Sequence, residues 1–202
     1  MKYIMDRKKN RAFLVFVFLL LLMNIAFPSD LGFMNEVFLP LESFKNRANY
    51  EELKPRMLDG FGAYRTAGHK HAGLDIKGGF TEPVYSIGIG VVKAIYGEFP
   101  YATVLIEHHL QNNEIIYSGY IHIEDIEVRV NQIVNQNTRL GRLFSEKEFK
   151  EADFYENHLH FEVRKTIERY RGISIKCVSI EELNKYFYDP VIFMKEQMRG
   201  SR

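Results

Sequence analysis

Two short stretches of the sequence carry histidine and aspartate at spacings that suit a metal ion. The stretch HKHAGLD holds His69, His71 and Asp75, and the later stretch HLHFEVR holds His158 and His160. Imidazole nitrogens and carboxylate oxygens are donors that zinc takes in proteins, and a catalytic zinc has three protein ligands and one open position. His71, Asp75 and one histidine of the later pair would supply such a set.

The later stretch reads as a β-strand with one polar and one apolar face. Because side chains alternate along a strand, His158 and His160 share a face, with Cα atoms about 6.6 Å apart. Leu159, Phe161 and Val163 then point to the opposite face, into a core. A bare H-x-H motif is short, so a pair of surface histidines on an amphipathic strand explains it equally well when it is taken alone.

Three further histidines have weaker claims to chemistry. His69 and His108 are interpreted as solvated or hydrogen-bonded residues. His122 lies in YIHI on a predicted strand, where it would face away from Ile121 and Ile123. A lone histidine there is more often structural, but beside a metal ion it becomes a candidate donor to a developing oxyanion.

Most of the chain has the residue pattern of β-strands separated by turns. Apolar and β-branched residues alternate with glycine punctuation in segments 82–97, 101–109, 115–123 and 126–134. The acidic and aromatic stretch SEKEFKEADFYE breaks this pattern and predicts a short helix or an ordered loop, and IEELNKYF predicts a helix capped by Ser179. We therefore predict one mainly β, antiparallel domain over residues 53–195, followed by a tail over 196–202.

The N-terminus predicts export. Basic residues precede the continuous apolar run AFLVFVFLLLLMNIAF at 12–27, which predicts an N-terminal hydrophobic helix. Sixteen helical residues span about 24 Å, slightly less than a bilayer core, and no A-x-A cleavage pattern follows. Residues 1–28 are therefore either a signal peptide or an N-terminal membrane anchor, and residues 29–52 are predicted to be a stalk or linker.

Composition removes two classes of function. The formal net charge is +1, so the chain lacks the basic excess that nucleic-acid binding needs, and we expect no nucleic-acid partner. The single Cys177 cannot form an internal disulfide and rules out a cluster of thiolate ligands.

Taken in order, the motifs resemble those of the lysostaphin and LytM type of zinc metallopeptidase, peptidase family M23. The resemblance covers about residues 53–194. It is carried by HAGLD, YIH and HLHFE, and by flanking segments that match the family's pattern: FGAYR, EPVYSIGIGVV, VLIEH, VNQIVNQNTRLGRL and DPVIFM. The fold that it implies is an antiparallel β-sheet sandwich with an open groove that holds zinc.

The resemblance also implies roles for individual residues. It makes His71, Asp75 and His160 the ligands of one zinc ion, and His158 and His122 the catalytic pair. No H-E-x-x-H motif places a glutamate as base, so a neutral histidine must take the proton. We favour His158 as base and His122 as oxyanion stabiliser, although the sequence does not separate the two roles.

The implied activity is hydrolysis of peptide bonds in bacterial peptidoglycan, in the periplasm or cell envelope, which agrees with the export signal. One departure from the family pattern keeps an alternative open. The loop before H-x-H, usually rich in Gly, Ser and Thr, is replaced by FSEKEFKEADFYEN at 144–157. This segment could narrow the groove, select a substrate or cover the site, or it could be an inconsequential helix. The alternative function is a self-occluded or non-catalytic relative that regulates another cell-wall hydrolase through a protein partner.

Overall fold

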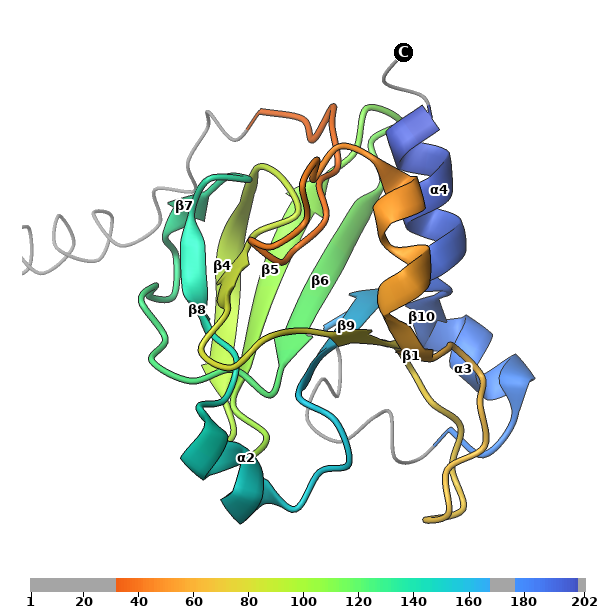
Figure 1. Cartoon of the computed structure of the whole chain (residues 1–202). Helices are drawn as coiled ribbons and strands as arrows, with labels where there is room; N and C mark the ends of the chain where they lie inside the picture. The colour runs from red at the N-terminus through yellow and green to blue at the C-terminus, as the bar shows by residue number, and fades with distance from the viewer. Residues whose placement is uncertain (1–31, 168–176, 200–202) are drawn as a thin grey trace, which may run out of the picture. The chain divides into compact units, whose positions relative to one another are not determined.

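The computed structural model describes residues 32–167 and 177–199, and its centre is one large antiparallel sheet (Figure 1). Eight strands form this sheet in the order β1-β2-β9-β6-β5-β4-β7, with β10 paired to the end of β9. Strands β3 and β8 form a separate two-stranded sheet. The predicted fold class, a mainly β antiparallel protein, is confirmed for these residues.

The elements follow one another in short steps along the chain. Their bounds are η1 Tyr50–Glu52, η2 Lys54–Arg56, β1 Met57–Asp59, β2 Leu74–Lys77, β3 Pro83–Tyr85, β4 Gly90–Tyr96, β5 Thr103–His109, β6 Ile115–Ile121, β7 Ile133–Val134, β8 Arg139–Arg142, α2 Glu146–Ala152, β9 His158–Arg164, α3 Ile180–Tyr186, β10 Phe187–Tyr188 and α4 Pro190–Arg199.

Strand alternation separates the core from the site. Leu159, Phe161 and Val163 of β9 are fully buried in the main apolar cluster, whereas the residues between them face the other side of the sheet. Tyr120 of β6 packs edge-on against Phe161, at 5.4 Å between ring centroids. The core therefore fixes β9 from behind and leaves its polar face for chemistry.

The segment before η1 is part of the domain rather than a free stalk. Leu39 and Leu41 are fully buried in the main core, and Leu41 pairs with Val84 in an isolated bridge. The backbone N–H of Tyr85 also donates to the carbonyl of Pro40. The stalk predicted over 29–52 thus differs from the observed packing, because its spaced apolar residues complete the core.

Helix α2 forms where the strand pattern broke, and its ends explain its bounds. Ser145 caps the N-terminus in a reciprocal capping box with Glu148, and Asp153 ends the helix with a left-handed backbone, φ +55°. Ser179 caps α3 as predicted. Helix α4 continues to Arg199, beyond the predicted domain end at residue 195. Figure 1 shows α2 and α4 at opposite corners of this part of the molecule.

The predicted signal peptide or anchor, with its hydrophobic helix at 12–27, lies outside the described residues. Among the residues that are described, no helix has the length and apolar character needed to cross a bilayer.

Candidate metal centre

Strand pairing brings the two sequence motifs together. Asp75 of β2 stands opposite His160 of β9 in the antiparallel register, and His71 approaches from the loop before β2. The Oδ1 atom of Asp75 lies 2.8 Å from Nδ1 of His160 and 3.1 Å from Nε2 of His71. These two nitrogens are 2.9 Å apart. Residues 85 positions apart in sequence thus present three donor atoms to one point.

The close approach depends on the glycine in HAGLD. A Cβ atom at Gly73 would lie 2.5 Å from the carbonyl oxygen of Phe161 and 2.8 Å from Nε2 of His160. Any side chain there would push β2 away from β9 and separate Asp75 from His160. The position accepts only glycine without movement of the backbone.

The imidazoles of His71 and His160 each have their second nitrogen fixed by an acceptor. Nδ1 of His71 donates to the carbonyl of Gly60 at 2.8 Å, and Nε2 of His160 donates to Glu162 at 3.1 Å. The converging atoms are therefore Nε2 of His71 and Nδ1 of His160. Such outer partners set the tautomer and ring orientation of metal-binding histidines.

The donor set fits a zinc ion. Bonds of about 2.0–2.2 Å in a tetrahedral arrangement hold ligand atoms about 3.3 Å apart, and the observed separations are 2.8 to 3.1 Å. An opening of a few tenths of an ångström therefore suffices. Burial opposes the proton on His160, but hydrogen bonds with Asp75 and Glu162 outweigh it and raise the pKa of His160 to about 9. A metal ion must displace that proton, so metal binding here competes with protons.

Arg65 holds the second oxygen of the aspartate ligand. Its guanidinium lies 2.6 Å from Oδ2 of Asp75 and 3.2 Å from Asp59. Burial opposes ionisation of Asp75, but hydrogen bonds from His160 and His71 outweigh it and hold its pKa well below the usual range. Asp75 is therefore a carboxylate at every working pH, with Oδ1 directed at the histidines.

Glu162 anchors His160 from the same face of β9. It is only 2% exposed, and it accepts a hydrogen bond from Nε of Arg164 at 2.6 Å. Burial disfavours the carboxylate, but the charges of Arg164 and His160 outweigh burial and lower the pKa of Glu162 to about 2. Arg164 in turn contacts the hydroxyl of Tyr96. The buried carboxylate connects the ligand to the rest of the sheet.

His158 and His122 flank the donor atoms. Nδ1 of His158 donates to the carbonyl of Glu156, and its Nε2 lies 3.8 Å from Oδ1 of Asp75. Nδ1 of His122 donates to the carbonyl of Pro100, and its ring centroid is 5.0 Å from that of His158. Both neutral rings therefore direct an unprotonated Nε2 toward the site.

The two imidazoles are held neutral by their surroundings. Burial lowers the pKa of His158. Burial, with the charge of His160 adding to it, lowers the pKa of His122 to about 3. Neutral imidazole is the form that accepts a proton.

His122 reaches this position by leaving the strand. Strand β6 ends at Ile121, and His122 has a φ of +67°, which is rare outside glycine and breaks the alternation. The sequence placed His122 within the strand, on the face opposite Ile121. In the structure the left-handed turn allows both residues to line one cavity.

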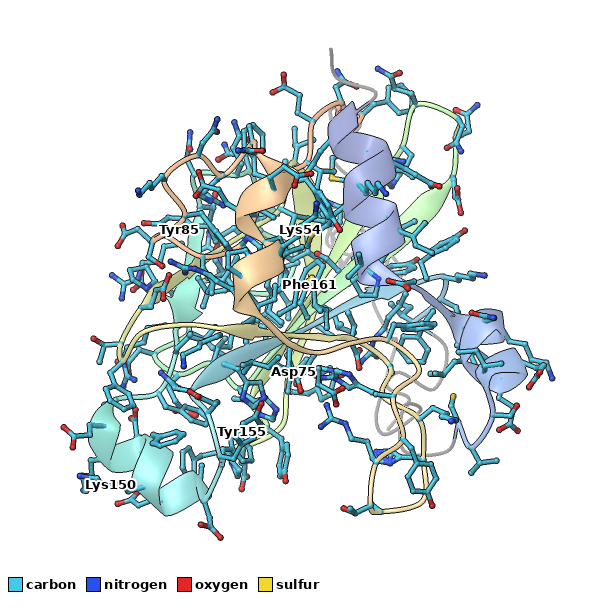
Figure 2. All side chains as sticks on the ribbon, turned by 45° about the vertical axis from the view of Figure 1, so that its right-hand side comes forward. Lys54, Asp75, Tyr85, Lys150, Tyr155 and Phe161 are labelled. Atoms are coloured by element: carbon cyan, nitrogen blue, oxygen red, sulfur yellow. The ribbon has the colours of Figure 1, made fainter. Side chains whose placement is uncertain are left out.

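That cavity has a volume of about 510 Å³ and contains both sequence motifs in its walls (Figure 2). His69 and Lys70 line it as well, together with Tyr101, Phe154 and Tyr155. Tyr155 and Asp75 line the same cavity, whereas Figure 2 shows Lys150 of α2 at the far end of the helix, projecting away from Asp75. The segment after α2 therefore forms a wall of the cavity.

The remaining histidine singled out in the sequence is structural. His108 is fully buried on the core face of β5, with Nδ1 donating to the carbonyl of Ile89 and Nε2 paired with the hydroxyl of Ser118. Sequence reasoning missed Arg65, although it quoted FGAYR, and it missed the carbonyls of Gly60 and Pro100, which carry no side-chain signal.

The antiparallel β-fold brings together a His-Asp-His set that could hold a metal ion, with two further histidines beside it. The family model described as peptidase family M23 matches residues 69–173, which is 105 of the 202 residues. The chain therefore belongs to peptidase family M23, a family of hydrolases that cleave peptides. A search of curated proteins found no match.

Several solved structures resemble this chain. LytU matches with a TM-score of 0.50 and 20% identity over 70% of this chain and 85% of that one. The catalytic domain of lysostaphin from Staphylococcus simulans matches with a TM-score of 0.48 and 18% identity over 73% of this chain and 98% of that one. A zinc containing peptidase from Vibrio cholerae is 26% identical, with a TM-score of 0.43, over 54% of this chain.

Coverage of these neighbours is uneven. The chain spans 32% of the Vibrio structure and 51% of an NMR structure of lysostaphin. The likeness to LytU therefore supports the fold of the domain. The activity of the whole protein is proposed below.

Proposed function

We propose that this protein is an exported, zinc-dependent endopeptidase that hydrolyses peptide bonds in bacterial peptidoglycan. The observation that carries the proposal is the convergence of three donor atoms, from His71, Asp75 and His160, with no two more than 3.1 Å apart. Membership of a peptidase family and the fit of the donor set to zinc support it.

His71, Asp75 and His160 would hold the zinc ion, which supplies a Lewis acid that polarises a carbonyl and lowers the pKa of water. Gly60 and Glu162 keep the ligand rings in the correct tautomers, and Arg65 keeps Oδ1 of Asp75 directed at the site. Because these partners are built into strands and paired loops, the ligands need little reorganisation to bind metal.

His158 is the residue that we assign as general base. Its Nε2 is unprotonated and lies 3.8 Å from Oδ1 of Asp75. A base must be neutral and within reach of the proton that it abstracts. His158 meets both conditions through the carbonyl of Glu156 and its own burial.

For His122 we propose a role other than the oxyanion stabiliser that the sequence favoured. The carbonyl of Pro100 holds the proton on Nδ1, so neutral His122 has no proton on Nε2 to donate to an oxyanion. We assign His122 as the partner of His158. His122 becomes a hydrogen-bond donor at Nε2 only after it has taken up a proton. Its ring centroid lies 5.0 Å from that of His158.

The self-occluded regulator is the weaker candidate. Segment 144–157 contributes Phe154 and Tyr155 to one wall of the cavity, and the metal-binding residues line the same cavity. A segment that occluded the site would lie between the cavity and the metal-binding residues, so those residues would not line the cavity. The predictions of export, of anchoring through residues 12–27 and of a regulatory protein partner rest on the sequence alone. Of these, we propose export together with the activity.

Digestion of purified peptidoglycan tests the proposal. The zinc-loaded chain should release soluble fragments whose masses identify one class of cleaved peptide bond, and His158→Ala should release none while it retains zinc. If the zinc-loaded chain leaves peptidoglycan and its isolated peptides intact, the proposed activity is wrong.

A further inference from the structure

An aromatic wall stands directly beside the histidine pair. The ring of Phe154 meets that of His122 edge-on, with centroids 4.7 Å apart, and lies 5.5 Å from that of His158. Tyr101 approaches His122 from the loop between β4 and β5, at 5.5 Å between centroids, and lies 6.4 Å from Phe154. The protonatable rings thus share one surface with two apolar ones.

The segment that supplies Phe154 is fixed at both ends. Arg142 forms a bidentate ion pair with Glu148 of α2, at 2.7 and 2.9 Å. Beyond the helix, the left-handed backbone of Asp153 turns the chain back, and the side-chain amide of Asn157 donates to the carbonyl of Gly79 at 2.9 Å. The wall is therefore preformed, as binding sites for small groups are.

The wall is also open to a ligand. Tyr101 is 60% exposed and Tyr155 is 77% exposed, and both line the cavity that contains the metal-binding residues. Ile121 lines it too, whereas the charged Arg65 and Lys70 lie on the side of the loop before β2. Apolar and basic side chains therefore both line the cavity.

We propose that Phe154 and Tyr101 are specificity-determining residues that form a subsite for an aliphatic side chain on the residue next to the scissile bond. This inference rests on the proposed function and names part of its substrate. A bond attacked beside His158 and His122 places its flanking residue within one side-chain length of these rings. Glycine at that position would leave the wall uncovered, whereas a methyl or larger aliphatic group would be removed from water.

The expected size of the preference follows from the area that such a group buries. Each methylene that is buried gives about a fourfold preference, which corresponds to about 0.8 kcal/mol. Alanine should therefore be favoured over glycine by about fourfold, and larger aliphatic groups by more until the cavity is filled.

Glycine pentapeptides with blocked ends test the proposal, with the central residue changed to alanine, valine or leucine in both L and D forms. We expect the purified, zinc-loaded full chain to cleave next to the substituted residue, with kcat/KM rising about fourfold from glycine to alanine. Phe154→Ala and Tyr101→Ala should each flatten this series while the zinc content stays the same. Phe33→Ala is the matched control, because Phe33 is an aromatic residue 50% exposed and outside the cavity.

NMR titration of zinc-loaded His158→Ala with the same peptides measures their affinity without cleavage. This measurement separates the inference from the proposed function. If the wild type cleaves nothing but the affinity series is present and disappears with Tyr101→Ala, the activity is wrong and the subsite stands. Because Tyr101 is largely exposed, its truncation should leave the fold intact. Equal kcat/KM and affinity for the glycine and leucine peptides, or a series that persists in both wall variants, would overturn the subsite.

Discussion

Glu162 offers the sharpest test of the proposed zinc site. Its Oε1 atom accepts from Nε2 of His160 at 3.1 Å, and its other oxygen pairs with Nε of Arg164 at 2.6 Å. Glu162→Gln preserves the shape and one acceptor oxygen, but it removes the charge and turns an amide N–H toward a guanidinium. We therefore expect two separable losses, one in zinc affinity and one in stability.

The magnitudes follow from these contacts. Loss of an outer partner of a metal-binding histidine weakens metal affinity about 10- to 100-fold, or about 1.4–2.7 kcal/mol. Arg164 is 3% exposed, and leaving a buried charge without its partner costs about 3–5 kcal/mol of unfolding free energy. The double variant Glu162→Gln/Arg164→Met removes the unpaired charge, so stability should recover while zinc affinity stays weak.

Two measurements separate these effects. Competition with a chromogenic chelator at pH 7 gives the zinc dissociation constant, and urea unfolding of the metal-free chain gives the stability. Glu107→Gln is the matched control, since Glu107 pairs with Lys93 and His109, both at 3.1 Å, and has no recorded contact with the metal-binding residues. Wild-type zinc affinity in Glu162→Gln, in a chain that remains folded, would refute the reasoning.

Three further predictions follow from the same geometry. Zinc at 1,000 times its dissociation constant should raise the free energy of unfolding by about 4 kcal/mol; His71→Ala should abolish this rise in thermal unfolding, and an equal rise in that variant would place the metal elsewhere. His158→Ala should retain one zinc by elemental analysis and lose peptide hydrolysis by at least about 100-fold, whereas near-normal turnover would remove His158 from the role of base. Burial lowers the pKa of His108 from 6.5 to about 4, so the unfolded chain binds more protons between these values and stability should fall by up to about 3 kcal/mol as the pH drops through them. Urea unfolding should show a smaller loss in His108→Asn than in the wild type, because the lowered pKa values of His122 and His158 add their own loss in both chains. The same pH dependence in both chains would contradict the prediction.

Periodicity predicted the face of β9 because the evidence was local. The alternation in HLHFEVR separated His158 and His160 from Leu159 and Phe161, and the structure buries the two apolar residues completely. Pairing of Asp75 with His160 followed from family motifs, since antiparallel register between distant strands leaves no mark on either strand alone.

Features set by backbone conformation or by distant loops were not predictable in this way. The positive φ of His122 breaks the strand alternation, and no adjacent glycine in the sequence predicts it. The carbonyls of Gly60 and Pro100 come from loops whose paths depend on the whole fold. Phe154 follows α2 in a segment that the sequence predicted as a short helix or an ordered loop, so its contact with His122 appears only in three dimensions.

The spaced apolar residues before η1 could have predicted that this segment packs on the core. Leu39 and Leu41 alternate with other residues as in a strand and are fully buried, although the composition of residues 29–52 suggested a linker. Short edge segments of this kind bury apolar side chains without forming a regular strand.

The central claim is that His71, Asp75 and His160 bind one zinc ion, and elemental analysis of the purified chain tests it most directly. The wild type should contain one zinc per chain, and Asp75→Asn should contain far less because the ligand oxygen loses its charge. Arg129→Ala, at a surface position outside the cavity, should retain the wild-type content. A wild type purified without zinc, and unable to take it up, would contradict the account, as would full zinc content in Asp75→Asn.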